Sequence, residues 1–265
     1  LPDCIDPAPF YDHEGNLYLT YGSFTCKGGL RVLKLDSKTG LRSNDNYEFK
    51  ADGLSDPYFG QKIANSNGEG PYILKVESSL SSTGYYYFLF WSQGNLRSTG
   101  GYNIRMFRSE YPDRGFVDMA GNSALSNIEA SNLGVRIMDN FKFTTLPYPS
   151  CANGGNSAIV TSDKKIFLHY HSKSSNSAAY GENGFIVKSN QMFLNEDGWL
   201  VTSPFKYNGE TLSPISSNIC GDYEFIRHRL EYYKDPADYS LNYVDSTVIT
   251  LNPDGTISGN ATGTY

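Results

Sequence analysis

The pattern of apolar and polar positions along the chain predicts short β-strands joined by turns. Hardly any segment places apolar residues at i, i+3, i+4 and i+7 over the length that a helix needs, whereas short runs of aromatic and β-branched residues recur between turn signals. Three stretches share one design: a polar or acidic residue leads into a strand, a turn follows, and a second strand is dense in aromatic residues. These stretches are residues 6–21, 69–91 and 156–171. The chain is therefore predicted to be all-β.

The spacing of the three stretches favours a β-propeller. Asp6 and Glu69 are 63 residues apart, and Glu69 and Asn156 are 87 apart, which is a loose repeat near the roughly 50 residues of a four-stranded blade with added loops. Blades repeated around an axis would bring the starts of these strands to one central cavity. The alternative is a β-sandwich, because hairpins resemble one another in many folds.

The character of the chain changes around Ser213. A polar stretch there leads into a clear hairpin over residues 247–259, with the turn Asn-Pro-Asp-Gly at its centre. We therefore expect a propeller over residues 1–212 and the start of a smaller β-rich module over residues 213–265, which ends in what still reads as a strand.

Composition narrows the function. Of the 265 residues, 14% are aromatic and 19% charged, and no apolar run approaches the ~20 residues of a membrane-spanning helix. The net charge is −6, and the basic residues are scattered, whereas nucleic-acid binding depends on clustered positive charge. The composition thus argues against a nucleic-acid or membrane partner. A neutral, hydroxyl-rich ligand such as a sugar fits a chain rich in Tyr, Asn and Ser.

Several catalytic signatures are missing from the sequence. It contains no phosphate loop, no dinucleotide fingerprint and no Gly-x-Ser-x-Gly elbow. The sequence therefore does not predict a kinase, a dehydrogenase or a serine hydrolase. The four cysteines form no Cys-x-x-Cys pair, so that one or two disulfides and isolated buried thiols both remain open. They are Cys4, Cys26, Cys151 and Cys220.

Two carboxylates stand out by position. Asp6 and Glu69 each open a strand beside Pro or Gly, in otherwise apolar surroundings. Burial raises the pKa of a carboxyl group, and a general acid for glycoside cleavage needs such a rise to keep its proton near neutral pH. Either residue alone would read as a turn or cap residue. Their recurrence at matching places in two repeats favours an acid–base pair.

Other polar residues are weaker candidates. Tyr102 and Asn103 follow two glycines and offer the stacking and hydrogen-bonding groups of a sugar site, although a turn into a core strand is the alternative. His169 and His171 alternate along one strand and face either the cavity or the core. Without a third ligand nearby, ordinary strand histidines explain this pair better than a metal site.

At these residues the sequence resembles the glycoside hydrolase family 43 endo-α-1,5-L-arabinanases of the larger, two-module bacterial type. The matching segments follow one another in order over nearly the whole chain, and two of them, Glu-Gly-Pro-Tyr-Ile and Gln-Met-Phe-Leu-Asn-Glu-Asp-Gly-Trp, are specific. The segments are residues 5–24, 69–73, 100–123, 155–157 and 191–199.

The resemblance implies a five-bladed propeller, of which this chain supplies most of the blades, that hydrolyses arabinan with inversion. Glu69 matches the general acid, and Asp6 matches an auxiliary Asp that orients it. The general base belongs to a first blade that lies upstream of Ile5-Asp6-Pro7 in the family. We therefore expect activity only together with a companion N-terminal segment or chain that carries the base. An arabinan chain in the groove would meet Ser23, Phe24, Tyr102 and Asn103.

The resemblance also implies a calcium ion, which the family holds through a His before Asn-Ser. That position is Gly155 here, so that any calcium would rely on water and carbonyl oxygens. A polymeric substrate implies an extracellular or periplasmic location. The alternatives are a non-catalytic carbohydrate-binding propeller and an exo-acting arabinofuranosidase. The intact motif around Glu69 favours an enzyme, since a binding protein needs no proton donor there.

Overall fold

The computed structural model describes residues 3–24, 26–96, 101–174, 184–210, 219–228 and 243–265. Its regular structure in these ranges consists of nineteen strands and two 3₁₀ helices, η1 (Cys26–Gly28) and η2 (Ala130–Asn132). The predicted all-β class is confirmed. Within the described ranges, no helix has the length and apolar character to cross a membrane.

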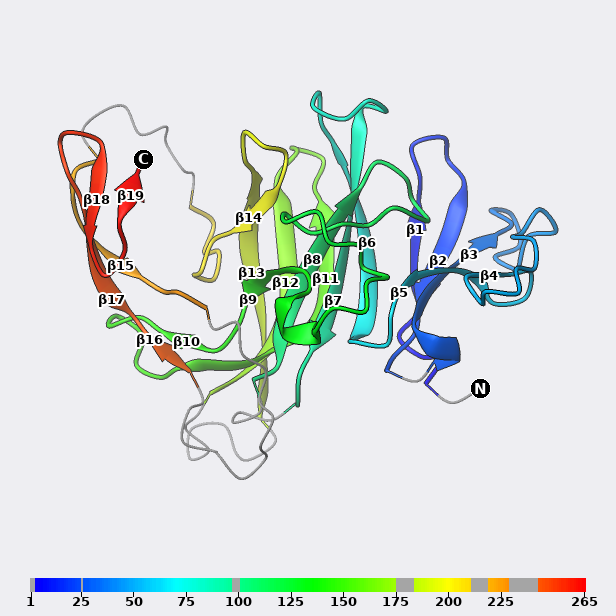
Figure 1. Ribbon diagram of the computed structural model, residues 1–265, viewed down its shortest axis with the longest axis horizontal. Coiled ribbons are helices and arrows are strands. Elements are labelled where there is room, and N and C mark those ends of the chain that lie inside the picture. The colour runs from blue at the N-terminus through cyan, green and yellow to red at the C-terminus, as the bar shows by residue number, and fades with distance from the viewer. Residues whose placement is uncertain (1–2, 25, 97–100, 175–183, 211–218, 229–242) are drawn as a thin grey trace.

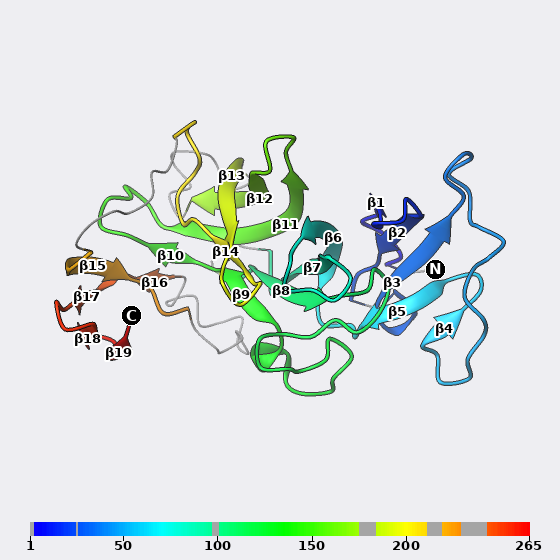
Figure 2. The same ribbon diagram turned by 90° about the horizontal axis from the view of Figure 1, so that it is seen from above.

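The strands form four sheets that follow one another along the molecule in chain order, except for β16 (Val244–Asp245), which joins the third sheet. The N-terminal sheet lies at one end and the C-terminal sheet at the other (Figures 1 and 2). The first sheet has the order β1-β2-β3-β5-β4, and all its neighbours are antiparallel. Its strands are β1 (Ala8–Tyr11), β2 (Leu17–Tyr21), β3 (Leu30–Leu35), β4 (Ser55–Asp56) and β5 (Gly60–Ala64).

The second sheet is an antiparallel meander in the order β6-β7-β8-β9. Its strands are β6 (Glu69–Glu77), β7 (Tyr85–Gln93), β8 (Asn103–Ser109) and β9 (Val135–Met138). The third sheet has the order β14-β13-β12-β11-β10-β16, and only the β10–β16 pair is parallel. Its strands are β10 (Phe141–Lys142), β11 (Ser150–Val160), β12 (Ile166–Ser174), β13 (Phe185–Leu194), β14 (Leu200–Thr202) and β16 (Val244–Asp245).

The fourth sheet lies near the C-terminus in the order β15-β17-β18-β19. Its strands are β15 (Gly221–Phe225), β17 (Thr247–Leu251), β18 (Thr256–Gly259) and β19 (Gly263–Thr264). The predicted hairpin over residues 247–259 is confirmed as β17 and β18. The predicted boundary after residue 212 lies outside the described residues.

The second sheet is buried on both faces. Phe88 and Phe90 of β7 pack with the apolar residues of β11 to β13, whereas Leu89 and Trp91 pack with those of the first sheet. This explains why β7 reads as an almost unbroken apolar run rather than an alternating one, as expected of a strand covered on both sides. Sheets stacked face to face in chain order agree with a propeller. The described strands form no closed ring, so the count of five blades stays a prediction.

Strand β11 begins at Ser150, whereas the sequence pattern places the start of the strand at Asn156. The ladder with β12 shifts register between Cys151 and Gly154 and again between Gly154 and Ser157. Each shift disturbs the alternation of inward and outward side chains on which the prediction depends. The residues of this irregular segment lie close to the candidate site.

A disulfide joins Cys4 to Cys26 across 22 residues, while Cys151 and Cys220 are thiols. The bridge ties the segment before β1 to the start of η1. Replacing both bridged cysteines by Ser is expected to lower the free energy of unfolding by about 3 kcal/mol, because the denatured chain gains loop entropy. Urea unfolding of the double variant checks this, with Cys220→Ser as a control that breaks no bridge. An unchanged midpoint in the double variant would contradict the prediction.

Candidate active site

The candidate site lies where segments of three sheets meet. Asp6 lies two residues before the start of β1, Glu69 is the first residue of β6, and Asn156 lies in β11. The Asp6 Oδ2 atom accepts the Gly70 N–H at 3.2 Å, and the Asn156 Nδ2 atom donates to the Gly70 carbonyl at 3.2 Å. The predicted meeting of the three repeat starts is therefore confirmed.

A β-bulge presents Glu69 at the end of its strand. Glu69 pairs with Ser92 and Tyr72 pairs with Phe90, so that β6 has one more residue than β7 between these pairs. The extra residue is accommodated at Gly70, whose φ of +61° lies in the left-handed region that glycine tolerates best. The bulge frees the Glu69 side chain from the regular pleat.

Two hydroxyl groups hold the Glu69 carboxylate. Tyr102 donates a short hydrogen bond to Oε1, and the Ser23 hydroxyl donates to Oε2 at 3.4 Å. Glu69 is half-buried, whereas Ser23 and Tyr102 are buried. Burial, and then the hydrogen bond to Glu69, raise the pKa of Tyr102, which keeps the phenol protonated as a donor. The arrangement fixes both oxygens of one carboxyl group in a partly open position.

The prediction that Asp6 lies in apolar surroundings is wrong. The residue is exposed, and its backbone has a φ of +55°. Its neighbour Ile5 accepts the Gly22 N–H at 2.8 Å, so Asp6 and the loop that carries Ser23 are held together. The exposure follows from the position of Asp6 before the strand begins. Asp6 accepts a hydrogen bond from the N–H of Gly70, the residue that follows Glu69.

Two glycines make room for the rings beside Glu69. Tyr102 stacks on His171 with ring centroids 5.8 Å apart and planes 2° apart. A Cβ atom on Gly154 would overlap the Tyr102 ring, and one on Gly155 would lie 2.5 Å from the His171 Cδ2 atom. The Gly154-Gly155 pair is therefore required for the position of Tyr102, and through it for the hydrogen bond to Glu69.

Gly154→Ala is expected to lower the free energy of unfolding by about 1–3 kcal/mol, as overpacking does, and to displace Tyr102 from Glu69. Gly263→Ala is the matched control, because its Cβ would meet nothing within 4 Å and its φ is not positive. Thermal unfolding together with a crystal structure of the variant measures both effects. An unmoved Tyr102 ring with parental stability would overturn the prediction.

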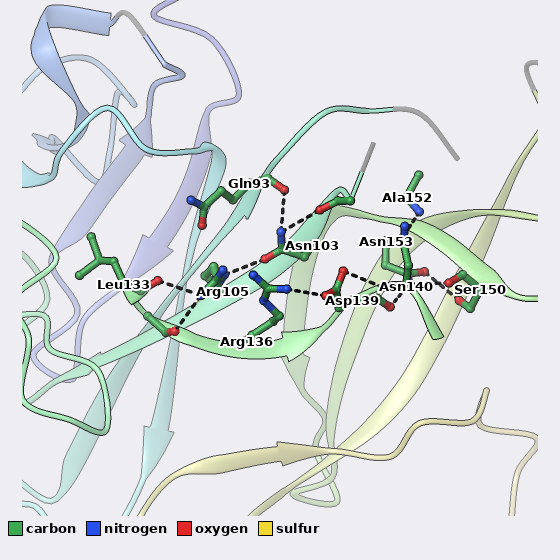
Figure 3. Close-up of polar contacts among 12 residues, drawn as sticks. Gln93, Asn103, Arg105, Leu133, Arg136, Asp139, Asn140, Ser150, Ala152 and Asn153 are labelled. Carbon is green, nitrogen blue, oxygen red and sulfur yellow. Dashed lines mark hydrogen bonds and ion pairs between the residues drawn. The ribbon is translucent and has the colours of Figure 1, made fainter. Parts of the chain in front are cut away.

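Asn103 does not take the ligand-facing position that the sequence predicts. Its Nδ2 atom donates to the carbonyls of Gln93 at 3.1 Å and Gly101 at 2.9 Å, and its Oδ1 atom accepts from Arg105 Nε at 2.7 Å (Figure 3). With both amide hydrogens used inside the fold and 1% of the residue exposed, Asn103 supports the structure. Phe24 follows Ser23 in the same loop and is half-buried.

A buried polar network continues from Asn103 towards β11 (Figure 3). Arg105 donates to the carbonyls of Leu133 and Gly134, each at 3.2 Å, while burial and then the nearby charge of Arg136 lower the pKa of Arg105 to about 9. Arg136 pairs with Asp139 at 2.6 Å, and both side chains are less than a tenth exposed. Two positive charges thus lie in the interior with Asp139 close by.

The network also supports the irregular start of β11. Asn153 donates to the Asp139 carbonyl at 2.6 Å, and Asn140 Oδ1 accepts the Ala152 N–H at 2.8 Å. Ala152 has a φ of +50°, which costs a non-glycine residue about 1–2 kcal/mol. These side chains stabilise the bend that leads to Gly154 and Gly155.

The described residues do not fit a metal ion held directly by several side chains. Gly155 has no ligating group, and no cluster of three or more His, Cys, Asp or Glu in the described ranges could hold a metal. His171 stacks on Tyr102, while the Nδ1 atom of His169 is 2.8 Å from the Ser189 hydroxyl. Calcium held through water and carbonyl oxygens stays a prediction.

Sequence reasoning missed Ser92 and did not assign a role to Asn156. Ser92 lies in an aromatic-rich strand and is fully buried, so nothing in the pattern marks it. Asn156 opens the third repeat stretch, at the place equivalent to Asp6 and Glu69. That equivalence was the available signal for a residue at the site.

Comparison with known proteins agrees with this geometry. Residues 2–200 match glycosyl hydrolases family 43, and residues 204–265 match a C-terminal lipocalin-like domain. The chain therefore belongs to glycosyl hydrolase family 43.

The similar proteins share one activity in their names. The chain is 36% identical to an extracellular endo-α-(1→5)-L-arabinanase of Thermotoga petrophila over 282 residues, and 32% identical to an extracellular endo-α-(1→5)-L-arabinanase 2 of Bacillus subtilis over 284. All of this chain is aligned, with 53% and 54% of these relatives. A crystal structure of the Thermotoga petrophila endo-1,5-α-L-arabinanase superposes with a TM-score of 0.79 at 34% identity, over 98% of this chain and 55% of that one. The chain spans about half the length of the curated relatives that it matches.

Proposed function

We propose that the chain contributes the general acid of an extracellular endo-α-1,5-L-arabinanase that is built as a five-bladed propeller and inverts the anomeric configuration. The hydrogen-bonded Glu69 carboxyl group is the observation that carries this proposal. Tyr102 and Ser23 each hold one of its oxygens, and Asp6 binds the next peptide. Membership of family 43 and the names of the two relatives supply the substrate class.

In the proposed reaction, Glu69 protonates the glycosidic oxygen of the departing arabinosyl unit. A water molecule attacks the anomeric carbon from the opposite face and loses its proton to a general base. Inverting glycosidases place the two carboxyl groups ~6.5–9.5 Å apart to leave room for that water. We propose that the base comes from a companion segment outside these 265 residues, since the relatives are about twice as long. A structure of the full-length protein tests this by the presence of a carboxylate at that separation from Glu69.

Hydrolysis of debranched linear arabinan by the full-length protein tests the function. Early release of short oligosaccharides of mixed length is expected, with the inverted β-anomer appearing first in the proton NMR spectrum. Arabinose as the sole early product would instead support an exo-acting enzyme. Retention of the polymer on the protein without any release of sugar would support a carbohydrate-binding role and contradict the proposal.

A further inference from the structure

Gly70, the residue that follows Glu69, is held from two sides by segments of other sheets. Its N–H donates to Asp6, which precedes β1, and its carbonyl accepts from Asn156 of β11. Gly70 itself lies in β6 with a left-handed φ of +61°. Three segments that are far apart in the sequence thus converge on one residue, Gly70, beside the candidate acid.

Ser92 determines which way the Asn156 amide faces. The Ser92 hydroxyl donates to Asn156 Oδ1 at 2.8 Å and accepts the Gly155 N–H at 2.8 Å. With Oδ1 engaged by Ser92, the Nδ2 group of Asn156 is directed to the Gly70 carbonyl. Ser92 is fully buried and Asn156 is 7% exposed, so that water competes little for these bonds.

We propose that Asn156, oriented by Ser92, is a positioning residue that fixes the direction of the Glu69 carboxyl group through the backbone of Gly70. This inference rests on the proposed function, because it assigns Glu69 the role of general acid. A glycine in a bulge has wide conformational freedom. Asp6 holds the Gly70 N–H and Asn156 holds the Gly70 carbonyl, so that rotation about the Gly70 backbone, which would displace Glu69, is restrained.

A role in positioning the acid can be separated from a merely structural role. Proton donation matters greatly when the leaving group is a sugar hydroxyl and little when it is an acidic phenol that departs as an anion. A residue that only stabilises the fold affects both substrates alike. Loss of a residue that aims the acid should therefore slow the cleavage of arabinan selectively.

Asn156→Ala in the full-length protein is the test, with linear arabinan and a 2,4-dinitrophenyl α-L-arabinoside as substrates. We expect kcat on arabinan to fall about 30- to 100-fold, as a misplacement near 1 Å does, with KM little changed and kcat on the aryl substrate within about threefold of the parent. Ser92→Ala is expected to give the same selective pattern. It serves in place of Asn156→Ala should that variant fail to fold.

Asn190→Ala is the matched control. Asn190 is also fully buried and also donates one side-chain bond to a carbonyl, that of Ser203 at 2.8 Å, but it lies in β13, two strands from β11. Its loss should change both substrates equally. Equal slowing of both substrates by Asn156→Ala, or no slowing at all, would overturn the proposal.

A crystal structure of the Asn156→Ala variant gives a second measurement that does not depend on activity. We expect the Gly70 peptide to rotate and the Glu69 carboxyl group to leave Tyr102. An unchanged Gly70 and Glu69 would refute the positioning role even if the protein acts on another sugar. A parent protein that cleaves no arabinan would refute the proposed function alone.

Discussion

Replacing Glu69 by Gln in the full-length protein is expected to lower kcat on linear arabinan by about 10²–10⁴-fold, the usual contribution of a general acid. Gln is close to Glu in size and can keep hydrogen bonds to Tyr102 and Ser23. Its amide group has no acidic proton that it could transfer to the departing sugar oxygen. Reducing-sugar release at saturating arabinan measures the effect, and KM should change little because the shape of the site is kept.

Glu77→Gln is the control for this substitution. Glu77 is the last residue of the same strand, β6, and it is exposed and paired with Lys164 at 2.9 Å. The same change of Glu to Gln at that end of the strand is expected to leave kcat at the parental value. Parental activity in Glu69→Gln, or an equal loss in Glu77→Gln, would remove Glu69 from the role of general acid.

Asp139→Asn is expected to lower the free energy of unfolding by about 3–5 kcal/mol, the effect of breaking a buried ion pair from one side. The substitution leaves the charge of Arg136 buried without its carboxylate, beside Arg105, whose pKa is already lowered by burial and by that neighbour. Chemical denaturation followed by tryptophan fluorescence measures the loss.

The exposed pair of Lys164 and Glu77 provides the comparison for Asp139. Its side chains are 69% and 61% exposed, and water and salt already screen such a pair. Glu77→Gln should therefore unfold at the parental denaturant concentration. A similar decrease in the denaturation midpoint of both variants would show that burial of the Asp139 ion pair does not increase its contribution to stability.

The sequence predicted the elements that follow simple periodicity. Hairpins are predicted within residues 6–21, 69–91 and 247–259, where turn signals separate apolar runs, and the structure contains all three, with strand ends that differ by up to two residues. The meeting of Asp6 and Glu69 also followed from the sequence, because equivalent positions of a repeat come together in space. These predictions depend on local pattern and on repetition, both of which a single sequence contains.

The remaining features depend on contacts between distant segments. Asn103 and Tyr102 are adjacent in the sequence and both polar, yet only Tyr102 reaches Glu69, because Arg105 engages Asn103 in the interior. The early start of β11 depends on the support of Ala152 by Asn140. Neither pairing can be read from spacing, since each is decided by how two sheets pack.

The disulfide between Cys4 and Cys26 makes the site dependent on oxidation. The bridge encloses both Asp6 and Ser23, which lie outside β1 and β2 and form hydrogen bonds to Gly70 and Glu69. Disulfides form in oxidising surroundings, whereas in most cytosols the cysteines stay reduced. Protein made in a reducing cytosol should therefore have a site in which the segments that carry Asp6 and Ser23 are loosely tethered, and oxidative refolding or export would form the bridge.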